Sequence, residues 1–166
     1  MSDVVLPAAY PSEPAEAANL IRQEVVAVLA GERDPVANMA NVAAILGHAV
    51  SGINWVGFYV AKGKELVLGP FWGLPACVRV GYGRGVCGTA WKRGETVIVD
   101  DVQEFPGHIA CDARSRSEIV VPLIQAGGVR AVLDCDAPSK ARFGPLEREL
   151  LEAVAQAVAA GSDFSL

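Results

Sequence analysis

Apolar residues recur at helical spacing near both ends of the chain and at strand-like spacing between them. In residues 12–31 and 143–161, apolar positions repeat every three or four residues, which predicts two amphipathic helices. Ser12 is the predicted N-cap of the first. An aspartate followed by a proline predicts the start of another helix over residues 34–52, because this pair favours helix initiation.

Between these helices the pattern changes to short runs rich in branched and aromatic residues. The predicted strands are residues 53–60, 65–71, 96–99, 119–124 and 129–133, and a short helix is predicted at 86–92. The first two strands flank a Lys-Gly-Lys turn and the last two flank a Gly-Gly pair, so each couple predicts a β-hairpin. These elements predict an α+β domain with a mainly antiparallel central sheet, and with the N- and C-terminal helices packed on one of its faces.

Composition and charge narrow the class of protein without identifying it. The chain has 166 residues, of which 52% are hydrophobic, and is expected to form one domain over residues 12–161. An extended lead-in at 1–11 precedes this domain, and a short tail at 162–166 follows it. The net charge of −5 argues against nucleic-acid binding, which needs a basic surface.

The N-terminus and the cysteines indicate a compartment. The N-terminus has no basic region followed by a long apolar run, and no run reaches the length of a membrane span. We therefore expect a cytoplasmic protein without a membrane partner, in a compartment where reduced thiols favour catalysis over structural disulfides. The four cysteines form no C-x-x-C pair and there are only two histidines, so no metal site is expected.

The stretch from His108 to Glu118 is the strongest candidate for chemistry. It places the thiol of Cys111 among an imidazole, two arginines and two carboxylates, immediately before an apolar strand. Cationic neighbours lower the pKa of a thiol and make a thiolate available near neutral pH. Because long polar loops are uncommon in compact domains, we expect segment 100–117 to be either functional or disordered. His108 is interpreted as part of the scaffold.

Two further cysteines, Cys77 and Cys87, lie in a glycine-rich connection over residues 73–88. Its G-x-G-x-x-G sequence at 83–88 matches a dinucleotide-binding fingerprint, but it follows an antiparallel hairpin instead of the first strand of a parallel βαβ unit. We therefore interpret the glycines as positions where the backbone turns tightly. A loop can carry its cysteines towards another thiol, so redox chemistry and passive thiols both remain open.

Another polar group, Asp134-Cys135-Asp136, follows the last predicted strand. Alternate residues of a strand share a face, so the two acids point one way and Cys135 points towards the core. The acids either bind a cation, hold one proton between them, or mark where the strand ends in solvent. Trp55 and Tyr59 share a strand face, as core residues or as a pocket for a small apolar group.

Together these segments resemble the free methionine-(R)-sulfoxide reductases, which are single GAF domains. The resemblance lies in Trp55-Val56-Gly57-Phe58-Tyr59, Pro75-Ala76-Cys77, Gly85-Val86-Cys87-Gly88-Thr89-Ala90, Phe105-Pro106-Gly107-His108-Ile109-Ala110-Cys111-Asp112, Ser117-Glu118-Ile119-Val120-Val121-Pro122 and Val132-Leu133-Asp134. It covers residues 15–160. A GAF domain that only senses a ligand is not expected to carry all three cysteines.

The resemblance implies a role for each matching residue. Cys111 matches the catalytic cysteine, and Cys77 and Cys87 match the resolving cysteines. The implied substrate contacts are the acids Glu118, Asp134 and Asp136, the aromatic rings of Trp55 and Tyr59, and the backbone at Ile109 and Ala110. The chain departs from the family at Cys135, where an aliphatic residue is expected, and at Trp72, where a more polar residue is expected.

The implied function is reduction of free L-methionine-(R)-sulfoxide to methionine. In the implied mechanism, the catalytic thiolate attacks the sulfoxide sulfur and becomes a sulfenic acid, and a resolving cysteine then closes a disulfide. An external dithiol such as thioredoxin reduces that disulfide, and no bound cofactor is expected. The sequence leaves open whether the chain forms a homodimer. The alternative function is a non-catalytic GAF module that senses a small ligand or the redox state.

Overall fold

The computed structural model describes residues 7–109 and 111–165. Its helices are α1 (Pro14–Leu29), α2 (Pro35–Ala49), α3 (Gly85–Arg93) and α4 (Pro145–Gly161), with a short 3-10 helix, η1, at Val102–Glu104. Its strands are β1 (Trp55–Lys62), β2 (Glu65–Gly73), β3 (Arg79–Gly81), β4 (Val97–Val99), β5 (Ser117–Gln125) and β6 (Gly128–Ala137). Within the described ranges, no helix is long and apolar enough to cross a lipid bilayer.

Capping carboxylates fix where the first two helices begin. Asp34 accepts a hydrogen bond from a backbone N–H group in the first turn of α2 at 2.9 Å, as the sequence predicts. The N-cap of α1 is Glu13 and not Ser12: its carboxylate accepts from two backbone N–H groups at 3.1 and 2.8 Å. The helix begins there because Pro14 has a backbone already suited to the first helical position and has no N–H group to leave unpaired.

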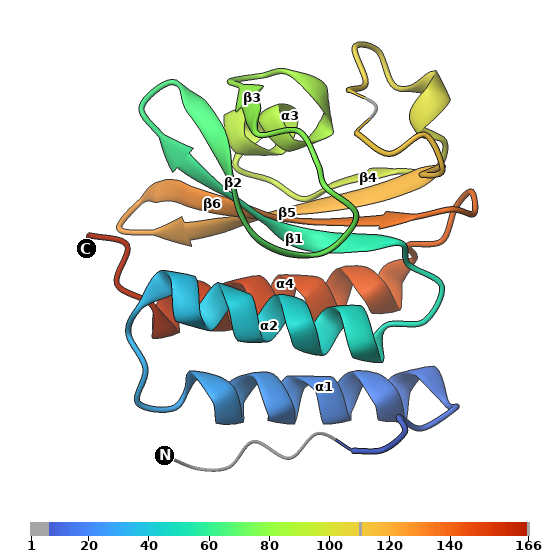
Figure 1. The fold of residues 1–166 in the computed structure, drawn as a ribbon, viewed down its shortest axis with the longest axis vertical. Helices are drawn as coiled ribbons and strands as arrows, with labels where there is room; N and C mark the ends of the chain where they lie inside the picture. The colour runs from blue at the N-terminus through green and yellow to red at the C-terminus, as the bar shows by residue number, and fades with distance from the viewer. Residues whose placement is uncertain (1–6, 110, 166) are drawn as a thin grey trace.

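The six strands form one sheet in the order β3-β2-β1-β6-β5-β4, and every neighbouring pair is antiparallel. The two predicted hairpins are present as β1–β2 and β5–β6, and they join through β1 and β6 (Figure 1). The sequence missed β3, because three residues are too few to give a recognisable alternation. This order places β1, β6 and β5 side by side.

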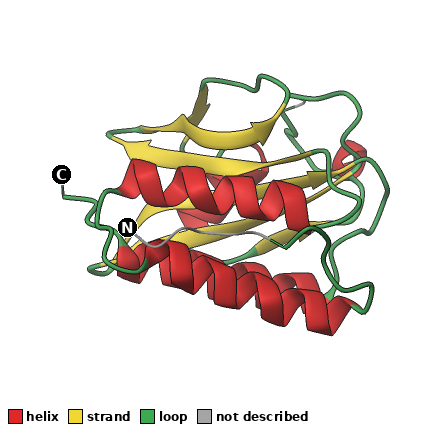
Figure 2. Ribbon diagram, turned by 60° about the horizontal axis from the view of Figure 1, so that its bottom comes forward, coloured by secondary structure: helices red, strands yellow, loops and turns green. Residues whose placement is uncertain are grey.

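The sheet divides the molecule into a helical side and a loop side (Figures 1 and 2). Helices α2 and α4 pack on one face of the sheet, and α1 packs on those two helices as an outer layer. Helix α3 lies against the opposite face, which is the loop side. The terminal helices therefore lie on one side of an antiparallel sheet, and the predicted fold class is confirmed.

Each face of the sheet has its own apolar core. On the helical side, Phe58 and Leu133 are buried against the helices, and Cys135 is buried with them as predicted. On the loop side, Tyr59 of β1 is buried in the same cluster as Cys87 of α3. Because successive strand residues point to opposite faces, the two acids that flank Cys135 belong to the loop side.

Trp72 departs from the polar residue expected at its position because it covers a helix. Its indole ring lies against Gly47 of α2, where any Cβ atom would collide with the ring. The side chain remains 42% exposed. The larger residue therefore adds contact between β2 and the helical side of the molecule, and it is accommodated by the missing side chain at Gly47.

The glycines of segment 83–88 build the turn that leads from β3 into α3. Gly83 and Gly85 have φ angles of 73° and 59°, and a Cβ atom on Gly88 would collide with the carbonyl oxygen of Gly81. The strand before this turn pairs antiparallel with β2, so the segment is not part of a parallel βαβ unit and the interpretation as turn glycines is confirmed. The placement of Cys87 in a movable loop is wrong, because the helix that these glycines initiate contains it.

Candidate active site

Three acids from two neighbouring strands meet on the loop side of the sheet. Glu118 on β5 pairs across the sheet with Asp136 on β6, and Asp134 lies two residues earlier on the same strand. On the other side of β6, β1 places Trp55 opposite Asp136 and Gly57 opposite Asp134. The sheet register therefore joins the two aspartates, as their spacing predicts, to an acid and an aromatic ring from distant parts of the chain.

These acids are held out of water and close together. Glu118 and Asp134 are each only 6% exposed, so the alternative in which the strand ends in solvent is wrong. Burial, followed by the negative charge of Asp136, raises the pKa of Glu118 well above its usual value. Burial, followed by the charge of Glu118, raises the pKa of Asp134 in the same way. Both shifts favour the protonated forms of these two carboxyls.

Cys87 faces the same carboxyls from α3. Its sulfur and one oxygen each of Glu118 and Asp134 all lie within 4.8 Å of one another. Burial, followed by the charge of Asp134, raises the pKa of the Cys87 thiol well above its ordinary value. A protonated thiol is a poor nucleophile, so the surroundings of Cys87 are the opposite of those that activate a cysteine.

Cys111 and Cys77 form a disulfide, with their Cα atoms 5.6 Å apart. Cys111 is exposed and Cys77 is half-buried, whereas Cys87 and Cys135 are buried and free. The sequence left the partner of Cys111 open between two cysteines. The fold decides it for this oxidised form, because Cys77 lies in the loop between β2 and β3 while Cys87 is fixed in a helix.

Trp55 and Tyr59 hold the segment that carries Cys77. The Tyr59 hydroxyl donates to the Cys77 carbonyl at 2.9 Å, and the Trp55 ring N–H donates to the Leu74 carbonyl at 3.0 Å. The two rings lie 6.0 Å apart between centroids, and Phe71 stacks on Trp55 at 5.5 Å. Both rings are buried, and they stand beside the acids on the loop side. These aromatic residues therefore line one side of the site and also hold the segment that carries Cys77.

Asp112 ties the segment after Cys111 to the sheet. Its carboxylate accepts from Arg114 at 2.7 Å and from the side-chain amide of Asn54 at 3.1 Å. The hydrogen bonds from Arg114 hold the pKa of Asp112 far below its usual range. The expectation that Arg114 activates Cys111 is therefore weakened, because this guanidinium is already paired with a carboxylate. Asn54 was missed by the sequence analysis.

His108 contacts an acid of the site, which its interpretation as scaffold did not include. Its Nε2 atom lies 3.6 Å from Oε2 of Glu118. Burial lowers the pKa of His108, so the imidazole is neutral at neutral pH and brings no full positive charge to the carboxyl pair. A loop histidine ten residues before a strand acid gives no local signal of this contact.

The segment before Cys111 reaches the start of α3. A Cβ atom built on Gly85 would lie 3.2 Å from the Cδ1 atom of Ile109, so that side chain packs over the helix N-terminus. Ile109 is 38% exposed. Ala110 lies outside the described residues, and the backbone contact expected at 109 and 110 stays a prediction.

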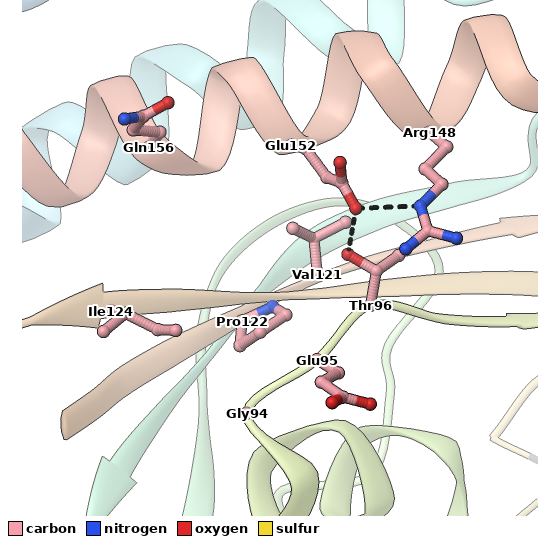
Figure 3. A pocket seen from close by; sticks show the side chains of 9 residues that line it. All are labelled: Gly94, Glu95, Thr96, Val121, Pro122, Ile124, Arg148, Glu152 and Gln156. Atoms are coloured by element: carbon pink, nitrogen blue, oxygen red, sulfur yellow. Dashed lines mark hydrogen bonds and ion pairs between the residues drawn. The ribbon is translucent and has the colours of Figure 1, made fainter. Parts of the chain in front are cut away.

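A separate hollow lies between α4 and the edge of the sheet (Figure 3). Within it, Arg148 and Thr96 both donate to the same oxygen of Glu152, at 2.9 and 2.6 Å. Its lining residues include neither a cysteine nor a histidine, and the carboxylate of Glu152 is already paired. The candidate active site is therefore the cysteine and acid cluster on the opposite face of the sheet.

Known proteins are similar to this chain over most of its length. The GAF domain family model matches residues 13–161. The free methionine-R-sulfoxide reductase of Escherichia coli (strain K12) is 47% identical over 123 residues, which cover 74% of each chain. The free methionine-R-sulfoxide reductase of Saccharomyces cerevisiae is 43% identical over 136 residues, covering 77% of this chain and 76% of the relative. An X-ray structure of free methionine-R-sulfoxide reductase from Neisseria meningitidis, in complex with its substrate, has a TM-score of 0.90 and 43% identity, covering 94% of both chains.

The helical layers, the antiparallel sheet and the family model together define the class, which is that of the GAF domains. Similarity at this level of identity and coverage is specific within that class. The chain belongs to the free methionine-R-sulfoxide reductase family of GAF domains. The resemblance carried by its sequence motifs is confirmed.

Proposed function

We propose that this chain reduces free methionine-R-sulfoxide to methionine. The observation that carries the proposal is the arrangement of an exposed cysteine, Cys111, disulfide-bonded to Cys77, on the same side of the sheet as a buried carboxyl pair whose pKa values are raised. Relatives 47% and 43% identical to the chain carry the name of this activity. Thiol and proton are the two reagents that sulfoxide reduction needs.

The carboxyl pair supplies the proton. A sulfoxide sulfur becomes electrophilic when its oxygen is protonated or hydrogen-bonded, and a carboxyl group can do this at neutral pH only if its pKa is raised. Glu118 and Asp134 meet that condition, because burial and their mutual repulsion favour the neutral form. One of this pair therefore acts as the acid.

The cysteines supply the electrons. The Cys111 thiolate attacks the sulfoxide sulfur, and cleavage of the S–O bond gives methionine and a sulfenic acid on Cys111. The Cys77 thiol condenses with that sulfenic acid, which releases water and closes the disulfide. In this scheme Cys77 is the resolving cysteine, and the second expected resolving residue, Cys87, is not required.

The remaining groups hold the two ends of the amino acid. The half-buried Asp136 is the acid assigned to the ammonium group, while Trp55 and Tyr59 form an apolar surface for the methyl group. In this proposal, backbone N–H groups near Ile109 bind the carboxylate, a contact that oriented amides commonly make. This charge pattern favours a free amino acid, because a residue inside a peptide has neither an ammonium nor a carboxylate group.

The cycle ends with reduction of the disulfide by an external dithiol of the thioredoxin class. The exposed Cys111 gives such a reductant access to one sulfur of the bond. Repeated turnover then requires a reducing compartment, which is the reason to place the protein in the cytoplasm.

The test is methionine production from separated R and S sulfoxides, free and within a peptide, with thioredoxin, thioredoxin reductase and NADPH. We expect turnover of the free R form, none with Cys111→Ser, and a single methionine per chain with Cys77→Ser. Cys135→Ser is the matched control, because that thiol is buried on the other face of the sheet. Full multiple turnover by Cys111→Ser would contradict the proposal, and ligand binding without turnover by the unaltered protein would favour a sensory module.

A further inference from the structure

The buried thiol of Cys87 has no role in the proposed reaction. Cys87 is fixed in the first turn of α3, 6% exposed, and free of any disulfide. A core thiol normally faces apolar side chains. This one faces Glu118 and Asp134, with the three potential ligand atoms within 4.8 Å of one another.

One atom of this cluster has no partner. Oδ1 of Asp134 is buried without a hydrogen bond, and the residue is only 6% exposed to solvent. Such unpaired buried atoms are rare because each one costs free energy. Among the described ranges, no lysine or arginine forms an ion pair with Glu118, Asp134 or Asp136. The cluster therefore contains acidic groups and an unpaired oxygen, and no lysine or arginine of the described residues is paired with them.

The residue types in the cluster favour a particular class of cation. Thiolate sulfur combined with carboxylate oxygen is a donor set of Zn²⁺, Cd²⁺ and Co²⁺, whereas Mg²⁺ and Ca²⁺ take oxygen alone. The Nε2 atom of His108 is a nitrogen donor of the same preference that lies 3.6 Å from a Glu118 oxygen, outside the group of three mutually close atoms. In a tetrahedral zinc site, neighbouring ligand atoms lie about 3.3–3.8 Å apart, so side-chain movements of roughly 1 Å would close this cluster around an ion.

We propose that Cys87, Glu118 and Asp134 form a binding site for a thiophilic divalent cation such as Zn²⁺. The three elements that carry the main ligands are α3, β5 and β6, so the sequence could not reveal the site from cysteine and histidine spacing. An ion held there occupies Glu118 and Asp134, the two carboxyls that the proposed reaction uses. The metal is therefore an inhibitor.

This inhibition rests on the proposed function, but the binding does not. The sulfoxide group of the substrate and the metal ion both need Glu118 and Asp134. Raising the sulfoxide concentration should therefore relieve the inhibition. Cys87 would then link activity to the supply of zinc without taking part in the thiol exchange.

The direct test is a Cd²⁺ titration of the oxidised protein, in which the Cys77–Cys111 disulfide leaves Cys87 and Cys135 as the free thiols. We expect one equivalent of Cd²⁺ to produce the ultraviolet thiolate-to-cadmium charge-transfer band. Cys87→Ser should lose the band, and Cys135→Ser should keep it. Absence of the band in the unaltered protein, or its retention in Cys87→Ser, would overturn the proposal.

A second pair of variants guards against a folding defect in Cys87→Ser. Glu118→Gln and Asp134→Asn keep the shape of each side chain and every thiol, and each should weaken Zn²⁺ binding roughly tenfold or more by calorimetry. Unchanged affinity in both would contradict the assignment of the ligands. Circular dichroism of each variant shows that the fold is kept.

The functional consequence is measured on pre-reduced, desalted protein in a single turnover, because dithiol reductants themselves bind zinc. Zn²⁺ should slow methionine formation in both proteins. The Zn²⁺ concentration that halves the rate should be about tenfold higher for Cys87→Ser than for the unaltered protein. Equal sensitivity of the two proteins would overturn inhibition through this site. Failure of metal-free protein to form methionine would instead contradict the proposed function, and the Cd²⁺ titration would still decide the metal site.

Discussion

Glu118 and Asp134 lie in surroundings that oppose their charge, and this sets their effect on stability. Their folded-state pKa values are raised, so the native protein binds more protons than the unfolded chain above the ordinary carboxyl pKa of about 4. The contribution of this extra proton binding to the free energy of unfolding is fully present below a pH of about 4, the ordinary carboxyl pKa. It is lost as pH rises through the folded-state pKa.

We therefore expect Asp134→Asn to unfold at higher denaturant concentration than the unaltered protein at neutral pH. The amide removes one like charge and donates to Glu118, with a gain of about 1.4 kcal/mol for each pH unit above the unfolded-state pKa, up to the folded-state pKa. Chemical denaturation of both proteins from acid to alkaline pH measures this gain in the free energy of unfolding, which should shrink towards acid pH. The same variant should lose activity.

Asp101 provides the control of opposite sign. Its pKa is lowered by a hydrogen bond from Lys140, so its contribution to stability is present above the ordinary carboxyl pKa and lost in acid. Asp101→Asn should therefore lower stability at neutral pH. If both variants moved stability in the same direction with pH, the assigned environment of Asp134 would be wrong.

A change at Tyr59 can distinguish methionine formation from disulfide closure, because its ring contacts the substrate in the proposed site and its hydroxyl supports the Cys77 segment. Tyr59→Phe keeps the apolar surface but loses the hydrogen bond to the Cys77 carbonyl. We expect a normal first methionine per chain and slower disulfide closure, by roughly fivefold for a bond that contributes about 1 kcal/mol. Rapid-quench measurement of methionine beside loss of free thiols tests this. An equal slowing of both steps would place the hydroxyl in the chemical step.

At the scale of elements, α3 is positioned by its contact with the turn before it. The missing side chain of Gly88 allows the helix to approach the carbonyl oxygen of Gly81, and both partners are backbone, so neither can move aside cheaply. Cys87 is the neighbouring residue. The depth at which its thiol faces the acids therefore depends on this one close approach.

We expect Gly88→Ala to lower the free energy of unfolding by about 1–3 kcal/mol, because the added methyl group overlaps backbone. It should also weaken Cd²⁺ binding, since α3 must shift away from the Gly81 carbonyl and carries Cys87 with it. Gly128→Ala is the matched control: no atom lies within 4 Å of its Cβ position, and its stability should change by less than about 0.5 kcal/mol. Denaturation of the two variants beside the unaltered protein measures the difference. Equal stability would mean that the turn adapts.

What could be predicted at this scale follows from the range of the interactions. The helices and hairpins repeat their apolar positions within a few residues, so their periodicity revealed them, down to the cap at Asp34. Strand β3 and the N-cap Glu13 were missed because short elements leave little pattern. Local periodicity also gives no information about which face of the sheet α3 covers.

At the scale of the whole molecule, the site is assembled by contacts between distant segments. The shared face of Asp134 and Asp136 could be predicted, since it depends only on strand alternation. Their meeting with Glu118 depends on the register between β5 and β6, and the contact of His108 depends on a long irregular segment. The family resemblance supplied what local patterns could not, and it named Glu118 and the cysteines but not Asn54 or His108.

The disulfide couples the redox state to the stability of the whole domain. Cys77 and Cys111 are 34 residues apart, and closing a loop of that length in the unfolded chain removes entropy equivalent to about 3–4 kcal/mol. Oxidised protein should therefore melt roughly 10 °C above reduced protein, for a chain of this size. Scanning calorimetry with and without reductant measures the shift, and Cys77→Ser should melt at one temperature in both. Equal melting of the oxidised and reduced unaltered protein would mean that the reduced form gains compensating contacts. The expected shift instead makes the reduced, substrate-accepting state the looser one, with its two cysteine segments free to admit the sulfoxide.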